Sequence, residues 1–446
     1  MTNTRRNFLK KTMAGSAALT LGGVLPGFSA KSYNRILGAN EKVPIGIMGV
    51  NSRGLAHATN CAKMAGCEII HICDVDSRAI AKCINEVKKL NGGNPRATPD
   101  FRKALEDKSL EAMFVATPDH WHAPAGILAC KAGKHVYLEK PCSHNPHEGE
   151  LVVAAAERYD RVVQMGNQRR SWPNVIAAIA ELRNGTIGRP YFAKGWYTNN
   201  RPSIGTGKVA EVPSWLDYEL WQGPAPRKTY KDNLIHYNWH WFWHWGTGEA
   251  LNNGTHMIDL MRWGLDVDYA SRATSAGGRY RYKDDWETPD TQVITLEFDN
   301  NTSMVWEGRS CNGRTIEGAP VGVIFYGDTG SLMINDNSYI IYDLENKVVK
   351  EVKETAAIDA RNTSNPSANL DQLHIQNFFD GIRKGEKLNA DILSGHKSTL
   401  LCQLGNIALR TSNALHIDSS NGRIINDASA RKLWQREYEP GWEPKV

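Results

Sequence analysis

The stretch VPIGIMGVNSRG, residues 43–54, decides the fold that we expect for this chain. Its apolar run ends at Val50 and gives way to small and polar residues and then to a helical pattern. This succession predicts a buried parallel strand, a tight turn and a helix. Gly49, Asn51 and Gly54 occupy the three glycine positions of the pattern G-x-G-x-x-G. Gly49 permits the turn, Gly54 lets helix and strand pack closely, and asparagine tolerates a positive φ.

A helix that begins at such a turn offers free N–H groups and the positive end of its dipole to a pyrophosphate. Taken alone, such a turn is about as typical of an ordinary strand–helix connection as of a nucleotide-binding site. The next apolar run, residues 68–73, ends at Asp74, twenty residues after Gly54. A carboxylate there accepts hydrogen bonds from the adenosine ribose and repels a 2′-phosphate, although Arg78 could accommodate that phosphate. We therefore expect NAD in preference to NADP. The candidate cofactor-binding residues of this turn are Gly49, Asn51, Ser52, Arg53, Gly54 and Asp74.

Composition excludes several classes of partner. The 446 residues are enough for two domains, and the net charge of +5 is modest for that length. Because no basic run or basic amphipathic stripe follows the N-terminus, we expect neither nucleic acid nor an anionic membrane surface as a partner. The spacings of the eight cysteines match neither a metal knuckle nor a small disulfide framework. We interpret most of them as buried thiols.

Residues 1–30 have the pattern of an export signal. A charged start is followed by a mildly apolar stretch, residues 13–25, and then by small residues. This stretch is too short for a permanent membrane span. The pair Arg5-Arg6 close to FLK is typical of a twin-arginine signal, and an ordinary secretory signal is the alternative. We expect a signal peptide at 1–30, a linker at 31–42, and an exported, periplasmic protein.

Strand-like and helical segments alternate over residues 43–165. This alternation predicts an α/β protein that begins with a doubly wound parallel sheet, a Rossmann domain that binds NAD(P). Short alternating runs such as residues 291–298 predict a largely antiparallel sheet with one covered face in the second part of the chain, residues 166–446. Ligands bind at the carboxyl ends of parallel strands. The polar clusters at 117–122 and 139–141 directly follow predicted strands, so we place the site there.

Lys140 is the first candidate for chemistry. It follows a predicted strand and precedes Pro141. A lysine that stands alone in such a place is usually a solvated loop residue. Beside oxidised nicotinamide, however, partial burial and the positive ring would lower its pKa toward neutrality. Lys140 could then exchange a proton with a substrate hydroxyl as hydride leaves carbon.

The second candidate is the stretch GTGEALNNGTHMID, residues 246–259. If a helix begins near Asn252, then Asn252 and His256 share one face and Asp259 lies nearby. His256 would be the general base, and Asn252 would position the hydroxyl. The alternative is a capping asparagine and a core histidine whose hydrogen bonds are satisfied. Since the set offers few good metal ligands, we expect no metal.

The third candidate is the stretch NWHWFWHW, residues 238–245. In an extended segment its four tryptophans would line one face, with the histidines on the other. Tryptophan faces against pyranose C–H groups, with polar tips reaching hydroxyls, would make a sugar site. Core packing is an equally good interpretation, and both stay open. The candidate substrate-binding residues here are Trp239, His240, Trp243 and His244.

Together these motifs resemble the Gfo/Idh/MocA oxidoreductase family, and most of all its exported, glucose–fructose oxidoreductase-like members. The resemblance rests on the nucleotide turn, ATP at 116–118 with HAP at 122–124, EKP at 139–141, GNQR at 166–169, WQGP at 221–224 and the His256 segment. It implies an NAD(P)-binding Rossmann domain at 43–165 and a substrate-binding α/β domain at 166–446 with a large open, mainly antiparallel sheet. It also implies an NAD(P) cofactor, a carbohydrate substrate and a homo-oligomer. It places Thr117, Pro118, His120, His122, Glu139, Lys140 and Asn167 at the cofactor, and Arg169, Asn252 and His256 at the substrate.

Two residues depart from the family pattern: Asn51 replaces the middle glycine, and Asn252 stands where many members have aspartate. An amide cannot share a proton, so more of the acid–base work would fall on Lys140 and His256. We expect hydride transfer between nicotinamide and a secondary hydroxyl or ketone of a sugar or glycoside, with a cofactor that stays bound. The alternatives are a redox-assisted glycoside hydrolase or lyase and a non-catalytic sugar- or nucleotide-binding protein. The resemblance disfavours the hydrolase, because such members tend not to keep Glu-Lys-Pro.

Overall fold

The computed structural model describes residues 42–355 and 367–446. The predicted signal peptide at 1–30, and the predicted linker up to residue 41, lie outside the described residues. Within the described part of the chain, none of the helices combines the length and the apolar character that crossing a membrane requires. The eight cysteines all lie in this part and are buried free thiols, as the sequence predicts.

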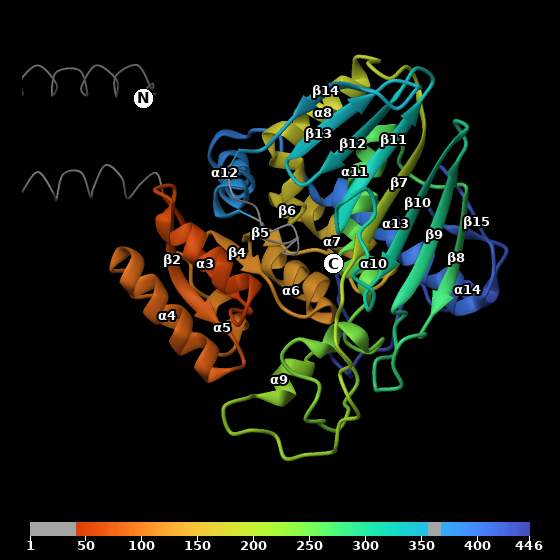
Figure 1. Cartoon of the computed structure of the whole chain (residues 1–446). Helices are drawn as coiled ribbons and strands as arrows, with labels where there is room; N and C mark the ends of the chain where they lie inside the picture. The colour runs from red at the N-terminus through yellow and green to blue at the C-terminus, as the bar shows by residue number, and fades with distance from the viewer. Residues whose placement is uncertain (1–41, 356–366) are drawn as a thin grey trace, which may run out of the picture. The chain divides into compact units, whose positions relative to one another are not determined.

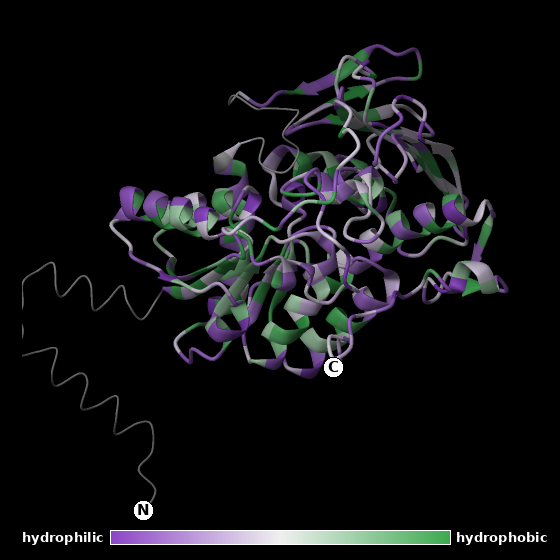
Figure 2. Ribbon diagram, turned by 90° about the horizontal axis from the view of Figure 1, so that it is seen from below, coloured by the Kyte–Doolittle hydropathy of each residue, from purple (hydrophilic) through white to green (hydrophobic). Residues whose placement is uncertain are grey.

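The first half of the described chain forms a six-stranded sheet in which every pair of neighbours is parallel. The strand order is β3-β2-β1-β4-β5-β6. Its strands are β1 (Val43–Met48), β2 (Cys67–Cys73), β3 (Arg96–Ala97), β4 (Ala112–Val115), β5 (His135–Leu138) and β6 (Val163–Met165). Its helices are α3 (Arg53–Lys63), α4 (Ser77–Asn91), α5 (Phe101–Leu105), α6 (Asp119–Lys131) and α7 (Pro146–Arg158). The predicted doubly wound parallel sheet is confirmed, and Figure 2 shows hydrophobic residues concentrated in its strands.

The turn after β1 has the geometry that its glycines predict. Gly49 has φ +82°, and a Cβ there would lie 2.6 Å from the carbonyl oxygen of Ala116. A Cβ at Gly54 would lie 2.0 Å from the carbonyl oxygen of Gly49. A side chain at Gly49 would therefore push the turn away from the end of β4. A side chain at Gly54 would push α3 away from the end of β1.

The second half forms a ten-stranded sheet in the order β14-β13-β12-β11-β7-β10-β9-β8-β15-β16. β7 and β10 pair in parallel and all other neighbours are antiparallel, so the predicted mainly antiparallel sheet is confirmed. The strands are β7 (Pro190–Thr198), β8 (Arg272–Gly278), β9 (Thr291–Phe298), β10 (Thr302–Arg309), β11 (Val321–Gly327), β12 (Ser331–Asn335), β13 (Ser338–Tyr342), β14 (Val348–Val352), β15 (Leu415–Ile417) and β16 (Ile424–Ile425).

Helices pack on one face of this sheet, and burial alternates strictly along β10 for that reason. The helical segments are η2 (Gln168–Ser171), α8 (Pro173–Arg183), α9 (Tyr218–Gln222), η3 (Asn238–Trp241), α10 (Glu249–Asn252), α11 (Gly254–Leu265), α12 (Ala368–Lys384), α13 (Ile392–Thr411) and α14 (Ala428–Arg431). The segment between β7 and α10 forms long loops that carry α9 below the large sheet (Figure 1).

The two halves are tied together by the C-terminal helices. Ile375, Phe378 and Phe379 of α12 pack into the core of the six-stranded sheet, beside β1 and β4. α13 packs against both α7 and α11. The chain therefore returns to the nucleotide-binding half after it has built the large sheet. A division at residue 165 stays a prediction.

Candidate active site

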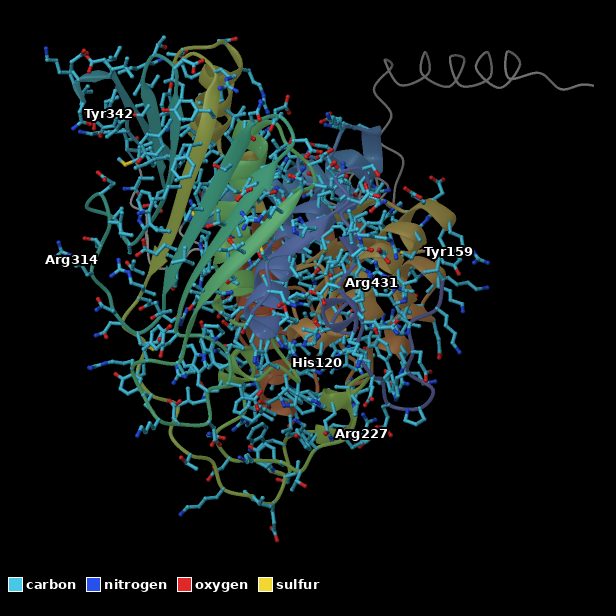
Figure 3. The ribbon with its side chains drawn as sticks, turned by 90° about the vertical axis from the view of Figure 1, so that its right-hand side faces the viewer. His120, Tyr159, Arg227, Arg314, Tyr342 and Arg431 are labelled. Atoms are coloured by element: carbon cyan, nitrogen blue, oxygen red, sulfur yellow. The ribbon has the colours of Figure 1, made fainter. Side chains whose placement is uncertain are left out.

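A cavity of about 470 Å³ opens at the carboxyl ends of β1, β2, β4 and β5, facing the loops that follow β7. Many of the predicted site residues line it: Gly49, Asn51, Ser52, Arg53, Asp74, Thr117, Pro118, His122, Glu139, Lys140, Trp239, His240 and Asn252. Other predicted residues lie outside its lining: Gly54, His120, Asn167, Arg169, Trp243, His244 and His256. Figure 3 shows His120 inside the fold, beneath the large sheet.

The nucleotide end of the cavity fits NAD. Ser52 precedes α3 without capping it, so the first N–H groups of that helix are not taken by a side-chain cap. The Asp74 carboxylate accepts hydrogen bonds from the backbone N–H of Val50 at 2.6 Å and of Asp76 at 2.9 Å. Burial raises the pKa of Asp74, and these two hydrogen bonds oppose the rise. A carboxylate held at this place suits a ribose diol and repels a 2′-phosphate.

Arg53 lines the cavity, but its guanidinium binds two carboxylates. Its Nε lies 2.6 Å from Glu139 Oε1, and its Nη1 and Nη2 bind Asp371 at 3.0 and 2.7 Å. His57 Nε2 also lies 2.8 Å from Glu139 Oε1. Burial alone would raise the pKa of Glu139, but the charge of Arg53 and the hydrogen bond with His57 hold it well below its usual range. Glu139 is therefore a fixed anion directly before Lys140.

Lys140 joins the two halves of the site. Its Nζ donates to the backbone oxygen of Asn252 at 2.7 Å and to Asn252 Oδ1 at 3.1 Å. The peptide bond between Lys140 and Pro141 is cis. Burial lowers the pKa of Lys140, while the negative charges of Glu139 and Asp119 act in the opposite direction. A half-buried amine at the cavity wall can hand a proton to, or take one from, a ligand hydroxyl.

The helix around His256 differs from the prediction. It does not run continuously from Asn252, because α10 ends there and α11 starts at Gly254. His256 is only 1% exposed, and neither ring nitrogen has a hydrogen-bond partner among the described residues. Burial lowers the pKa of His256 well below its ordinary value, and the charges of Lys140 and Arg169 lower it further. The acid–base role of His256 stays a prediction.

Residues near His256 are also buried. Asp259 accepts both hydrogen bonds of a paired guanidinium, from Arg170 Nε at 2.8 Å and Nη2 at 2.9 Å, which makes it a structural ion-pair partner. Asn167 is buried, and within residues 42–355 and 367–446 neither polar atom of its side chain has a hydrogen-bond partner. Arg169 is buried as well, with Asp336 Oδ1 3.9 Å from its Nη2.

The tryptophan-rich stretch at 238–245 is not extended, and that prediction is wrong. Its first half is the short helix η3, because N–H groups of this stretch bond to carbonyl groups three residues earlier. The rings of Trp239 and His240 stack with centroids 3.6 Å apart, and both line the cavity. Trp241 instead stacks on Trp286 at 3.9 Å. The stretch thus contributes to the cavity and to the core at different positions.

The remaining candidates hold loops in place. His122 Nδ1 lies 2.6 Å from the carbonyl oxygen of Pro141, and its Nε2 lies 2.8 Å from that of Thr117. His122 therefore ties the turn after β4 to the turn after β5. His120 Nε2 lies 3.0 Å from the carbonyl oxygen of Trp221, and His244 Nε2 lies 2.7 Å from that of Pro226. Trp243 faces the guanidinium of Arg410.

Sequence reasoning missed one wall of the cavity. Tyr197, Asn199 and Arg201, at and after the end of β7, line it beside Asn253. Arg201 Nε donates to Glu249 at 2.9 Å, and Asn252 Nδ2 donates to the same carboxylate at 3.1 Å. No motif marks these residues in the sequence. The only feature that could have indicated them was the predicted antiparallel sheet, because residues at the ends of its strands can contact a substrate.

Two family models match the chain. The model described as "Oxidoreductase family, NAD-binding Rossmann fold" matches residues 43–167, and "Oxidoreductase family, C-terminal alpha/beta domain" matches residues 204–444. The chain belongs to the Gfo/Idh/MocA oxidoreductase family. The resemblance seen in the sequence is confirmed, and so is NAD as the cofactor of its Rossmann domain.

Individual relatives are distant. The chain is 24% identical over 337 residues to an α-N-acetylgalactosaminidase of Tannerella forsythia, covering 71% of this chain and 70% of that protein. It is 27% identical over 228 residues to a glycosyl hydrolase family 109 protein of Saccharopolyspora erythraea, covering 47% of this chain and 49% of that protein. A solved levoglucosan dehydrogenase in complex with NADH and levoglucosan superposes with a TM-score of 0.65 at 18% identity. The superposition covers 84% of this chain and 99% of that one, which shows a shared fold.

Proposed function

We propose that this protein transfers hydride between NAD and a secondary hydroxyl or ketone of a sugar or glycoside. The observation that carries the proposal is Lys140 Nζ at the cavity wall, hydrogen-bonded to Asn252 of the opposite half. Bound NAD supplies the hydride acceptor or donor. Lys140, whose pKa burial lowers, takes the hydroxyl proton when the alcohol is oxidised and returns it when the ketone is reduced. Glu139 keeps a negative charge beside this amine, and His256 is a second proton acceptor in the proposal.

The wall opposite Lys140 supports a sugar as the substrate. It combines aromatic side chains, Tyr197, Trp239 and His240, with the hydrogen-bonding groups of Asn199 and Arg201. Aromatic faces bind the C–H groups of a pyranose, and amide and guanidinium groups bind its hydroxyls. We also propose that residues 1–30 direct export to the periplasm and that the protein forms a homo-oligomer.

The activity is tested by recording the absorbance spectrum of the purified protein before and after addition of a panel of glycosides. We expect a reduced-nicotinamide band that appears with a glycoside and persists. A redox-assisted glycoside hydrolase is the second candidate, because relatives of the chain are named α-N-acetylgalactosaminidase and glycosyl hydrolase family 109. That enzyme would give a band that rises and decays while the aglycone is released. No response with added NAD would leave a sugar- or nucleotide-binding protein.

We further propose that NAD stays bound between turnovers, held by a strap that covers the chain after Asp74. The strap consists of residues 215–217 and His236. Ser77 N donates to the Trp215 carbonyl at 3.0 Å, and Asp217 N donates to the Val75 carbonyl at 2.9 Å. If NAD does not dissociate, its nicotinamide must be reoxidised or rereduced while it is bound. A second sugar would then act as the oxidant or reductant.

Side chains reinforce the strap. His236 Nε2 lies 2.8 Å from Asp76 Oδ2, and the Arg78 guanidinium carbon lies 3.3 Å from the centre of a Trp215 ring. His236 also lines the cavity, so the strap and the cofactor share a wall. Opening the strap requires that these contacts break together.

Replacing His236 by alanine is expected to speed NAD dissociation about ten- to a hundredfold, because one hydrogen bond to a charged group contributes roughly 1.5–3 kcal/mol. The rate is measured by displacement of bound NADH, followed by its fluorescence. His416→Ala, at an exposed position on β15, is the matched control and should leave the rate unchanged. Equal dissociation rates in the wild type and His236→Ala would rule out the strap.

A further inference from the structure

A second groove adjoins the active cavity. It has a volume of about 950 Å³ and is lined by residues 198–200, 280–281, 290–291 and 311–313; we call it the outer groove. Asn199 lines both the outer groove and the active cavity. Asn199 therefore stands at the border between the cavity and the outer groove. The loop that carries Arg314, next to the groove, projects outward at the edge of the large sheet (Figure 3).

One wall of the outer groove displays an aromatic ring on a fixed loop. Tyr280 is 71% exposed, so most of its ring is accessible to a ligand. Its loop is anchored by the buried carboxylate of Asp290, whose Oδ2 accepts from Tyr280 N at 2.9 Å and Arg281 N at 3.0 Å. Arg279 Nη1 binds the same oxygen at 3.0 Å. The ring lies against Gly278, where a Cβ would be 3.0 Å from Tyr280 Cε1.

The other wall is also fixed by backbone hydrogen bonds. Asn199 N donates to the Arg309 carbonyl at 2.9 Å, and Arg201 N donates to the Ser310 carbonyl at 2.9 Å. Asn200 and Cys311 form an isolated antiparallel bridge between the two segments. The groove is thus formed before any ligand binds, and its lining combines the ring of Tyr280 with amide, hydroxyl and guanidinium side chains.

We propose that the outer groove is a subsite for a second sugar unit, so that the substrate is a disaccharide or longer glycoside. This inference rests on the proposed function. The reacting ring lies in the cavity beside Lys140, and the neighbouring unit packs its C–H face on Tyr280. Its hydroxyls bind polar side chains of the groove, which include Asn200, Asn312 and Arg281. A preformed site of this kind gives affinity because little is ordered on binding.

The test compares matched substrates: methyl β-glucoside with cellobiose, methyl α-glucoside with maltose, and methyl β-galactoside with lactose. For whichever pair the wild type turns over, we expect a higher kcat/KM for the disaccharide than for the methyl glycoside. Tyr280→Ala should raise KM for that disaccharide about three- to tenfold, the range of a lost aromatic contact, and leave the methyl glycoside unchanged. Tyr191→Ala, another exposed tyrosine on β7, is the control and should change neither substrate.

Equal preference for both members of the pair, or equal effects of Tyr280→Ala on both, would overturn the subsite. If no sugar is turned over, the proposed function fails, and calorimetric binding of the same pairs still tests the groove. Tighter binding of a disaccharide that is lost in Tyr280→Ala supports the subsite, and absence of that preference rejects it. Unfolding temperatures of the two variants should match the wild type, because both side chains are exposed.

Discussion

Replacing Lys140 by methionine is expected to lower kcat about a thousandfold and to change the Kd for NAD less than about threefold. Methionine keeps an unbranched side chain but lacks the amine, and positioned proton transfer typically contributes 10²- to 10⁴-fold. The cofactor is expected to bind at the turn after β1 and at Asp74, so its affinity depends little on this amine. Steady-state turnover and NADH fluorescence titration measure the two quantities separately.

The pH profile distinguishes a proton acceptor from a structural lysine. In the oxidation direction Lys140 acts as the neutral amine, so kcat rises with pH through its pKa, which burial lowers. This limb should disappear in Lys140→Met. Lys134→Met is the matched control, because Lys134 is a buried lysine whose Nζ donates to the Asp107 and Leu110 carbonyls at 2.8 and 2.9 Å, outside the cavity lining. Loss of NAD binding together with turnover in Lys140→Met would contradict the assigned role.

The parts of the fold that local patterns determine could be predicted from the sequence. The apolar run before Gly49 requires a buried strand, and Gly49 and Gly54 are the residues that the close contacts at the turn admit. The positions of Asp74 and Lys140 followed from the rule that parallel strands end at one edge of the sheet. Both residues line the cavity at that edge.

Tertiary contacts decided the rest. Asp371 lies 318 positions from Arg53, and no local pattern predicts that α12 packs into the nucleotide-binding half. Arg53 lines the cavity, and its role at the cofactor stays a prediction; its bonds to two carboxylates could not be foreseen. The stretch at 238–245 was predicted as extended from its alternation, but its aromatic rings pack in several directions. In a loop, the direction in which each side chain points depends on the residues that pack around it as much as on the alternation of its own sequence.

Replacing Arg53 by methionine is expected to lower the free energy of unfolding by ~3–5 kcal/mol, because it leaves two buried carboxylates without their cation. The side chains of Glu139 and Asp371 are 5% and 0% exposed. Asn60, whose Nδ2 lies 2.8 Å from Asp371 Oδ2, carries no charge, and burial and the charge of Arg53 lower the pKa of His57 in the wild type. Urea denaturation at neutral pH measures the loss. Arg102→Met, which breaks the exposed pair with Asp100, is the control and should cost less than about 1 kcal/mol.

The sign of the pH dependence follows from the lowered pKa of Glu139. A carboxylate whose pKa is lower in the folded state contributes stability above its unfolded pKa, about 4.3, and loses it as pH falls through the folded value. In Arg53→Met the pKa of Glu139 is no longer held down by the guanidinium, and burial raises it. Protonation of Glu139 then removes the unpaired charge in the variant. The difference in free energy of unfolding between wild type and variant should therefore shrink as pH falls below about 5. A deficit that is constant with pH would show that the lost packing of Arg53, and not its charge, supports the site.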